Sequence, residues 1–186
     1  MDTAEALRTR RTVHAYTTAP VPETVLARAL DAARHAPNHG LTFPWRFTRV
    51  GPQGRDTLAA LYVRLKDEAA GGSLSESKKA RYFTKSRNPA ELLVVSQVRD
   101  ADAFKAKEDY ASVAMAILKL HLSVHAEGYG AKWSTGGVTR HAETYATCGI
   151  DPDAEEIVGF VWVGVPRATP SLAERPPVTE LVRTTA

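Results

Sequence analysis

The segment from about Ala106 to Ala126 constrains the fold more than any other part of the chain. It carries the longest helical pattern in the sequence, and its small and apolar residues fall on more than one face of the expected helix: Ala111, Val113, Ala114, Ile117, Leu118, Leu120 and Leu122. A helix that is apolar around most of its circumference is a buried helix. This helix therefore lies either in the core of the domain or at an interface between subunits, and Gly128 is its natural C-terminal stop.

Shorter elements of both kinds surround this helix in the sequence. Apolar spacing and Pro or Gly boundaries predict helices over Thr3 to Arg10, Pro22 to Pro37, about Arg55 to Glu68 and about Thr139 to Thr147. Strands are expected at Trp45 to Val50, Leu92 to Val98 and Ile157 to Val165. The second of these strands is continuously apolar, which is typical of a strand buried on both faces. The mixed order of elements indicates an α+β sandwich.

Length and composition favour one globular domain over residues 1–186. The 186 residues are 44% hydrophobic and 24% charged, the balance of an ordinary folded domain. The small, polar stretch from Ala69 to Ser77 is expected to be a loop, because neither flank could form a complete core alone. After Pro166 the chain contains Pro170, Pro176 and Pro177 and little periodicity. It is expected to run as an extended arm without a helix or strand of its own.

Several classes of protein are excluded. No run approaches the roughly 20 apolar residues that span a bilayer, and no signal-like segment begins the chain, so we expect a cytoplasmic protein with no membrane partner. Cys148 is the only cysteine, which excludes an intrachain disulfide and a cysteine-rich zinc site. The histidines lack a metal-binding pattern, and no nucleophile motif is present, so neither a metal nor a covalent catalytic residue is expected.

Two segments carry groups that could hold an anionic cofactor. The triplet Arg10-Arg11-Thr12 follows a helix and could chelate a phosphate, although basic triplets are common and the triplet alone favours a solvated surface cluster. The segment from Gly128 to Gly137 holds four glycines in ten residues, which would let backbone N–H groups approach a ligand; structural turns are the alternative. The pattern is neither a Rossmann turn nor a P-loop.

Two further segments have more than one interpretation. Asn38 and His39, together with Trp45 and Phe47, could border a flat heteroaromatic ligand, or they could be turn and core residues. The basic run 78–87 contains two aromatic residues, but no nucleic-acid-binding fold accompanies it, so no nucleic-acid partner is expected. It is either a solvated face or a surface that attracts an anionic nucleotide.

Taken together and in this order, six motifs resemble the FMN-dependent nitroreductase family, in particular its small bacterial branch of minimal NAD(P)H nitroreductases. They are Arg10-Arg11-Thr12, Ala36-Pro37-Asn38-His39, Pro44-Trp45-Arg46-Phe47 and the segments 107–112, 126–133 and 157–166. The resemblance covers nearly the whole chain. It implies a central, mostly antiparallel sheet flanked by helices, and a homodimer with a swapped C-terminal arm.

The resemblance also implies two FMN molecules at the dimer interface and assigns residues to them. Arg10, Arg11 and Thr12 would hold the phosphate and ribityl end, with His35 nearby at a position where the branch usually has arginine. His39 would reach the flavin bound mainly to the partner subunit. The residues expected along the isoalloxazine near N5 are Trp133, Ser134, Thr135 and Gly136, where the branch has a different residue order. Arg167 is a further candidate for the phosphate.

The implied activity is that of an FMN-dependent oxidoreductase. NAD(P)H, the co-substrate, would pass hydride to flavin N5, and a small-molecule electron acceptor such as a nitroaromatic or quinone would then take its place in a ping-pong cycle. Two alternatives remain open. One is a flavoenzyme of the same fold with different chemistry, such as dehalogenation or enoate reduction, and the other is a flavin-binding protein with little turnover.

Overall fold

A four-stranded antiparallel sheet forms the centre of the computed structural model, which describes residues 1–88 and 90–185. Its strands neighbour one another in the order β1-β2-β4-β3, and every pairing is antiparallel. Their bounds are β1 (Trp45–Arg49), β2 (Glu91–Val98), β3 (Gly130–Ser134) and β4 (Glu155–Gly164). The central antiparallel sheet implied by the resemblance is confirmed.

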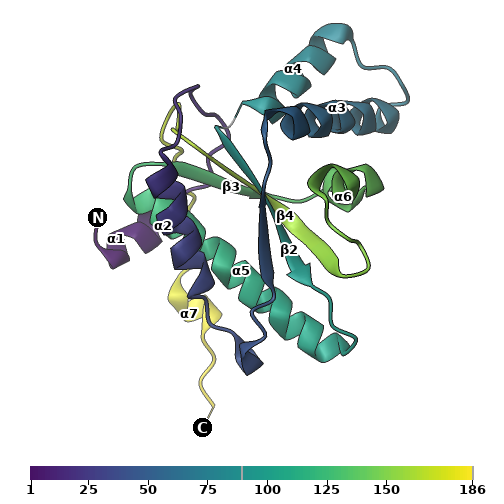
Figure 1. Cartoon of the computed structure of the whole chain (residues 1–186). Helices are drawn as coiled ribbons and strands as arrows, with labels where there is room; N and C mark the ends of the chain where they lie inside the picture. Colours follow the sequence, from purple (N-terminus) through teal and green to yellow (C-terminus); the bar gives the residue numbers. More distant parts are fainter. Residues whose placement is uncertain (89, 186) are drawn as a thin grey trace.

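Strand β2 is buried on both faces, as its continuous apolar run predicted. Successive residues of a strand point to opposite faces. Leu93 and Val95 therefore join the larger core cluster with the long helix, while Leu92 and Val94 join a smaller cluster on the other face. Helices consequently cover both faces of the sheet (Figure 1).

Three helices form the layer on the first face: α1 (Thr3–Thr9), α2 (Glu23–Arg34) and α5 (Ala103–Ala126). Helix α5 buries one stripe at helical spacing, which includes Val113, Ile117 and Leu120. Leu118, on the face away from this stripe, is exposed, and so is Tyr110 nearer the start of the helix. One face of the helix thus packs in the core, and an apolar face remains exposed.

The second face is covered by α3 (Pro52–Ala69), the 3₁₀ turn η2 (Gly137–Arg140) and α6 (Ala142–Cys148). Helix α4 (Glu76–Arg87) packs on α3 at the margin of the molecule, where the rings of Tyr62 and Tyr82 meet edge to face with their centroids 6.1 Å apart. A short 3₁₀ turn, η1 (His39–Leu41), precedes β1. No helix in the described ranges has both the length and the apolarity to cross a bilayer.

The structure differs from the sequence-based expectation at four elements. Helix α4 was not anticipated, because it buries no residue and so has no apolar stripe to detect. Strand β3 is only five residues long and lies inside the glycine-rich segment. The helix expected over 139–147 is divided into η2 and α6, since His141 takes an extended conformation and caps α6. The arm also contains a short helix, described next.

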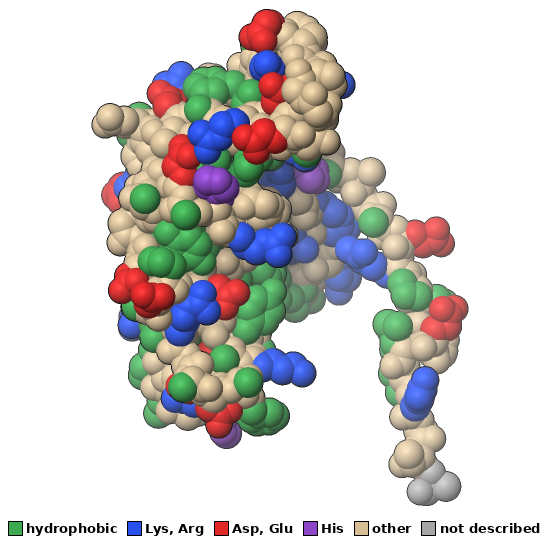
Figure 2. Space-filling model, turned by 90° about the vertical axis from the view of Figure 1, so that its right-hand side faces the viewer, with side chains coloured by type: hydrophobic (Ala, Val, Ile, Leu, Met, Phe, Trp, Pro, Cys, Tyr) green, Lys and Arg blue, Asp and Glu red, His purple; other side chains and the backbone are tan. Residues whose placement is uncertain are grey.

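The C-terminal arm projects away from the body of the molecule (Figure 2). Contrary to expectation, it forms one helical turn, α7 (Val178–Leu181), whose N-cap is Pro177. A helix of only four residues is too short for apolar periodicity to reveal it in the sequence. Residues 171–185 are all exposed, including Leu172, Val178 and Leu181. Residues 171–185 of the arm therefore do not pack against the core of their own chain.

Candidate functional site

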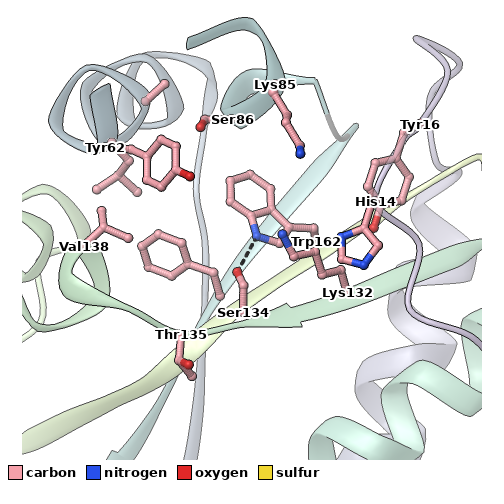
Figure 3. A pocket seen from close by; sticks show the side chains of 13 residues that line it. His14, Tyr16, Tyr62, Lys85, Ser86, Lys132, Ser134, Thr135, Val138 and Trp162 are labelled. Atoms are coloured by element: carbon pink, nitrogen blue, oxygen red, sulfur yellow. Dashed lines mark hydrogen bonds between the residues drawn. The ribbon is translucent and has the colours of Figure 1, made fainter. Parts of the chain in front are cut away.

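A cavity of about 180 Å³ lies between the sheet and the α3–α4 pair. Tyr62 from α3 and Phe160 and Trp162 from β4 provide its aromatic surface. The indole Nε1 of Trp162 donates a hydrogen bond of 2.9 Å to Ser134 Oγ (Figure 3). This bond fixes the indole plane at the centre of the cavity, so the cavity offers a rigid, flat surface to a ligand.

Strand register decides which residues of β3 reach this cavity. Lys132 is paired with Trp162 and Ser134 with Phe160, so these side chains share one face. Trp133 points to the opposite face, where it packs against the core around α5 and lies over Gly159. A Cβ at Gly159 would come within 2.2 Å of Trp133 Nε1. Of the predicted segment, Ser134 and Thr135 line the cavity, whereas the Trp133 side chain does not.

Three basic side chains enter the cavity, and none of the described Asp or Glu residues lines it. Lys85 comes from α4, Lys132 from β3 and His14 from the segment after α1; Figure 3 shows both lysines directed toward Trp162. Burial lowers the pKa of Lys132 below its ordinary value, and Lys85 lowers it further. Burial, then Lys132 and Lys85, lower the pKa of His14. These groups repel one another, so an electron-rich ligand edge would stabilise them.

A second cluster of uncompensated cations surrounds Arg10. Burial lowers the pKa of Arg10, and Arg11 and Arg175 lower it further. The side chain of Arg11 is turned back onto helix α1, where Nη1 donates a hydrogen bond of 2.8 Å to the Arg8 carbonyl. Within the described residues, buried Arg11 Nε and His121 Nε2 have no hydrogen-bond partner. A cluster of cations that includes an orphaned guanidinium N–H is the chemistry of an anion site.

The histidines of α5 lie beside this second cluster. Burial, with a contribution from Arg10, holds the pKa of His121 at about 4, so it is neutral at physiological pH. His125 Nε2 is 2.9 Å from Thr9 Oγ1, and its pKa is lowered by burial, Arg10 and Arg11. Among the described residues, no group of three or more His, Cys, Asp or Glu could hold a metal ion.

The segment 10–16 connects the two clusters. Thr12 forms an isolated parallel bridge with Ala131, and Val13 N donates a hydrogen bond of 3.1 Å to the Ala131 carbonyl. The chain thus runs along the free edge of β3, with Thr12 exposed beside it. It leads from Arg10 to His14, at the mouth of the cavity. Figure 2 shows Lys and Arg side chains gathered around the hollow between the body and the arm.

The two predicted histidines lie away from the cavity. His35 ends α2, where its Nδ1 is 2.8 Å from the Asp31 carbonyl oxygen and its own carbonyl accepts a bond of 2.6 Å from Lys119 Nζ. His39 is exposed in η1. Neither lines the cavity of its own chain.

Four basic residues at the site were missed as candidates: His14, Lys85, Lys132 and Arg175. His14 stands two residues after the predicted triplet, and Lys132 lies in the glycine-rich segment, so both positions could have been found from the sequence. Lys85 gave no separate signal within the basic run 78–87. Arg175 lies in the arm, where no periodicity placed it; it, and not the candidate Arg167, lowers the pKa of Arg10.

Comparisons with known proteins identify the family of this chain. The model of the "Nitroreductase family" matches residues 7–165. A Bacillus subtilis protein named "Putative NAD(P)H nitroreductase YfhC" is 28% identical over 177 residues, which are 95% of this chain and 90% of that protein. The structure of a nitroreductase-like family protein from Bacillus cereus has a TM-score of 0.82 at 22% identity and covers 100% of this chain and 96% of its own.

Another solved structure has a name that includes a cofactor and a co-substrate. It is a mutant of NfnB, described as an FMN and NADPH-dependent nitroreductase from sphigopyxis sp. strain HMH. It has a TM-score of 0.78 at 20% identity, with 99% of each chain covered. The fold is shared throughout, and the family match spans most of the chain. The chain belongs to the nitroreductase family.

Proposed function

We propose that this chain, as a single domain over residues 1–186, is an FMN-dependent oxidoreductase. It passes hydride from NAD(P)H through the flavin to nitroaromatic or quinone-like acceptors by a ping-pong mechanism. The observation that carries the proposal is a pair of cation clusters that have no carboxylate partners. The segment 10–16 joins the two clusters, and at one end lies the cavity with its flat aromatic surface. FMN combines a phosphate with a planar ring whose carbonyl edge accepts hydrogen bonds.

The residues present fit the phosphate of FMN at the Arg10 cluster. Arg10 lacks an ion pair in the described part of the chain and is repelled by Arg11 and Arg175, so a phosphate between them would replace repulsion with charge-assisted bonds. Thr12 is exposed beside Ala131 and offers a hydroxyl donor. His35 remains a prediction from the resemblance alone.

The ring would lie toward the cavity, where Ser134 and Thr135 offer hydroxyl groups. Trp133 and Gly136 would contribute through their backbones, since the Trp133 side chain packs on the other face of the sheet. When bound, FMN supplies reversible acceptance of a hydride. His14, Lys85 and Lys132 would stabilise negative charge at the ring in the way that preorganised donors stabilise an oxyanion.

No side chain needs to act as a nucleophile. Burial raises the pKa of the Cys148 thiol to about 11, so it stays protonated and unreactive near neutral pH. The work of this chain's own residues is to bind, to orient and to exclude water through aromatic side chains such as Tyr62 and Phe160.

The active form is proposed to be a homodimer with FMN at its interface. The outer face of α5 exposes Tyr110, Ala111 and Leu118, and the arm exposes Leu172 and the apolar residues of α7. Uncovered apolar surfaces of this kind mark interaction sites, and a two-fold axis would let a second copy cover both. In this arrangement His39 reaches the flavin of the neighbouring subunit.

The test is the oxidation of NADH and NADPH by the purified protein loaded with FMN, measured with and without a nitroaromatic or quinone acceptor. Acceptor-dependent oxidation with parallel-line kinetics is the expected result. Tight FMN binding without oxidation of either donor would support the alternative, a flavin-binding protein with little turnover. Failure to bind FMN would refute the proposal.

A further inference from the structure

A second, open groove of about 610 Å³ adjoins the aromatic cavity. The two share His14, Tyr16 and Lys85, so a ligand in the cavity can extend into the groove. The groove lies between helix α4 and the segment 14–16, and Arg167 closes one side. It is separate from the Arg10 cluster, whose residues do not line it.

One face of helix α4 supplies most of the groove's donors. Arg81, Thr84, Lys85 and Asn88 follow the spacing of a single helical face, and each carries a hydrogen-bond donor. Two other cations of this helix are neutralised. Lys79 pairs with Asp67 at 2.9 Å and with Glu76 at 3.2 Å, and Arg87 pairs with Asp56.

The cations that face the groove have no such counterions. Within the described residues, Arg81 and Lys85 form no ion pair, and no Asp or Glu lines the groove. The groove is also held in shape from both sides. Asn88 Nδ2 donates a hydrogen bond of 2.9 Å to the Tyr16 carbonyl, and Arg167 Nη2 lies 3.5 Å from the same oxygen. The positive charge of the groove is therefore held in a fixed arrangement, and no carboxylate of the described residues neutralises it.

The number of cations indicates the kind of anion. Arg81, Lys85, Arg167 and His14 line one groove, and His14 would add a positive charge when an anion favours its protonation. A phosphomonoester carries about −1.5 to −2 charges near pH 7, whereas a carboxylate or a phosphodiester carries about one. The groove therefore matches a phosphomonoester best.

We propose that this groove binds the 2′-phosphate of NADPH and thereby selects NADPH over NADH. The inference rests on the proposed function, which requires a reduced nicotinamide donor at the adjoining cavity. NADPH has one phosphomonoester that NADH lacks. A donor whose nicotinamide reaches the ring can extend past Lys85, so that its phosphate lies against Arg81 and Arg167.

The first test compares kcat/KM for NADPH and NADH in Arg81→Ala and in Lys78→Ala. Both variants remove one exposed cation from α4, but Lys78 does not line the groove. Arg81→Ala should lower the NADPH to NADH ratio of kcat/KM at least tenfold, which corresponds to about 1.4 kcal/mol. Lys78→Ala should leave the ratio unchanged. Equal losses for both donors in Arg81→Ala would overturn the assignment and point to the pyrophosphate.

The second test does not depend on turnover. Calorimetry with the FMN-loaded protein should show that adenosine 2′,5′-bisphosphate binds more tightly than AMP, and that Arg81→Ala removes this difference. Equal binding of the two nucleotides overturns the inference even if the enzyme is active, while a protein that oxidises neither donor refutes the proposed function separately. FMN affinity in Arg81→Ala should match wild type; a large loss would mean that the groove holds the flavin phosphate instead.

Discussion

Replacing Arg10 by alanine tests the phosphate site most sharply. Arg10 is partly buried beside two other guanidinium groups, and no carboxylate compensates it in the described structure. A charge-assisted hydrogen bond contributes about 1.5 to 3 kcal/mol. Its loss should therefore weaken FMN binding by roughly 10- to 150-fold, while turnover of the fully loaded enzyme changes much less.

Two comparisons separate a ligand contact from a structural role. Riboflavin lacks the phosphate, so its affinity should be nearly the same in wild type and in Arg10→Ala. Arg8→Ala removes the same charge from the exposed end of α1 and should leave FMN affinity unchanged. Because Arg10 is repelled by Arg11 and Arg175, the apoprotein variant should be as stable as wild type or slightly more stable.

The assay is titration of the apoprotein with FMN or riboflavin, followed by quenching of flavin fluorescence, with thermal unfolding of the same samples. A loss specific to FMN and to Arg10→Ala supports the phosphate site. Equal loss for both flavins, or a similar loss in Arg8→Ala, would assign Arg10 to the solvated surface and refute the reasoning.

Other perturbations test the remaining parts of the structure. Since the pKa of His121 is about 4 when folded and about 6.5 when unfolded, apoprotein stability should fall as pH drops from 6.5 toward 4, by on the order of 3 kcal/mol; denaturation of His121→Gln at both pH values should show a smaller drop, and an equal drop would contradict this. Deletion from Thr169 onward should weaken both the dimer and FMN binding, which sedimentation and flavin titration would measure; a stable holo-monomer would contradict the shared site. Gly159→Ala should displace Trp133 and cost about 1 to 3 kcal/mol of stability in denaturant unfolding, whereas Gly51→Ala, with open space around it, should not.

Much of the fold follows from local patterns in the sequence. The apolar run of β2 and the long pattern of α5 predicted elements that the structure contains at nearly the same bounds. Such patterns are visible because buried faces repeat with the period of the element. Helix α4 could not be predicted in this way, since it lies at the margin of the molecule and buries no residue.

The site was only partly predictable for a related reason. The triplet at Arg10 and the glycine-rich segment were identified as candidates, but the face to which each residue points depends on strand register. Pairing of Lys132 with Trp162 turns Lys132 into the cavity and Trp133 away from it. Arg175 acts on Arg10 from the opposite end of the sequence, through an arm without periodicity, and only the tertiary structure brings them together.

The most direct test of the proposed function is anaerobic mixing of the purified, FMN-loaded protein with NADPH, followed by the visible absorbance of the bound flavin. We expect the flavin band to bleach with one equivalent of NADPH per chain and to return when a nitroaromatic or quinone is added. A protein that cannot be loaded with FMN, or a bound flavin whose spectrum neither NADPH nor NADH changes, would contradict an FMN-dependent oxidoreductase.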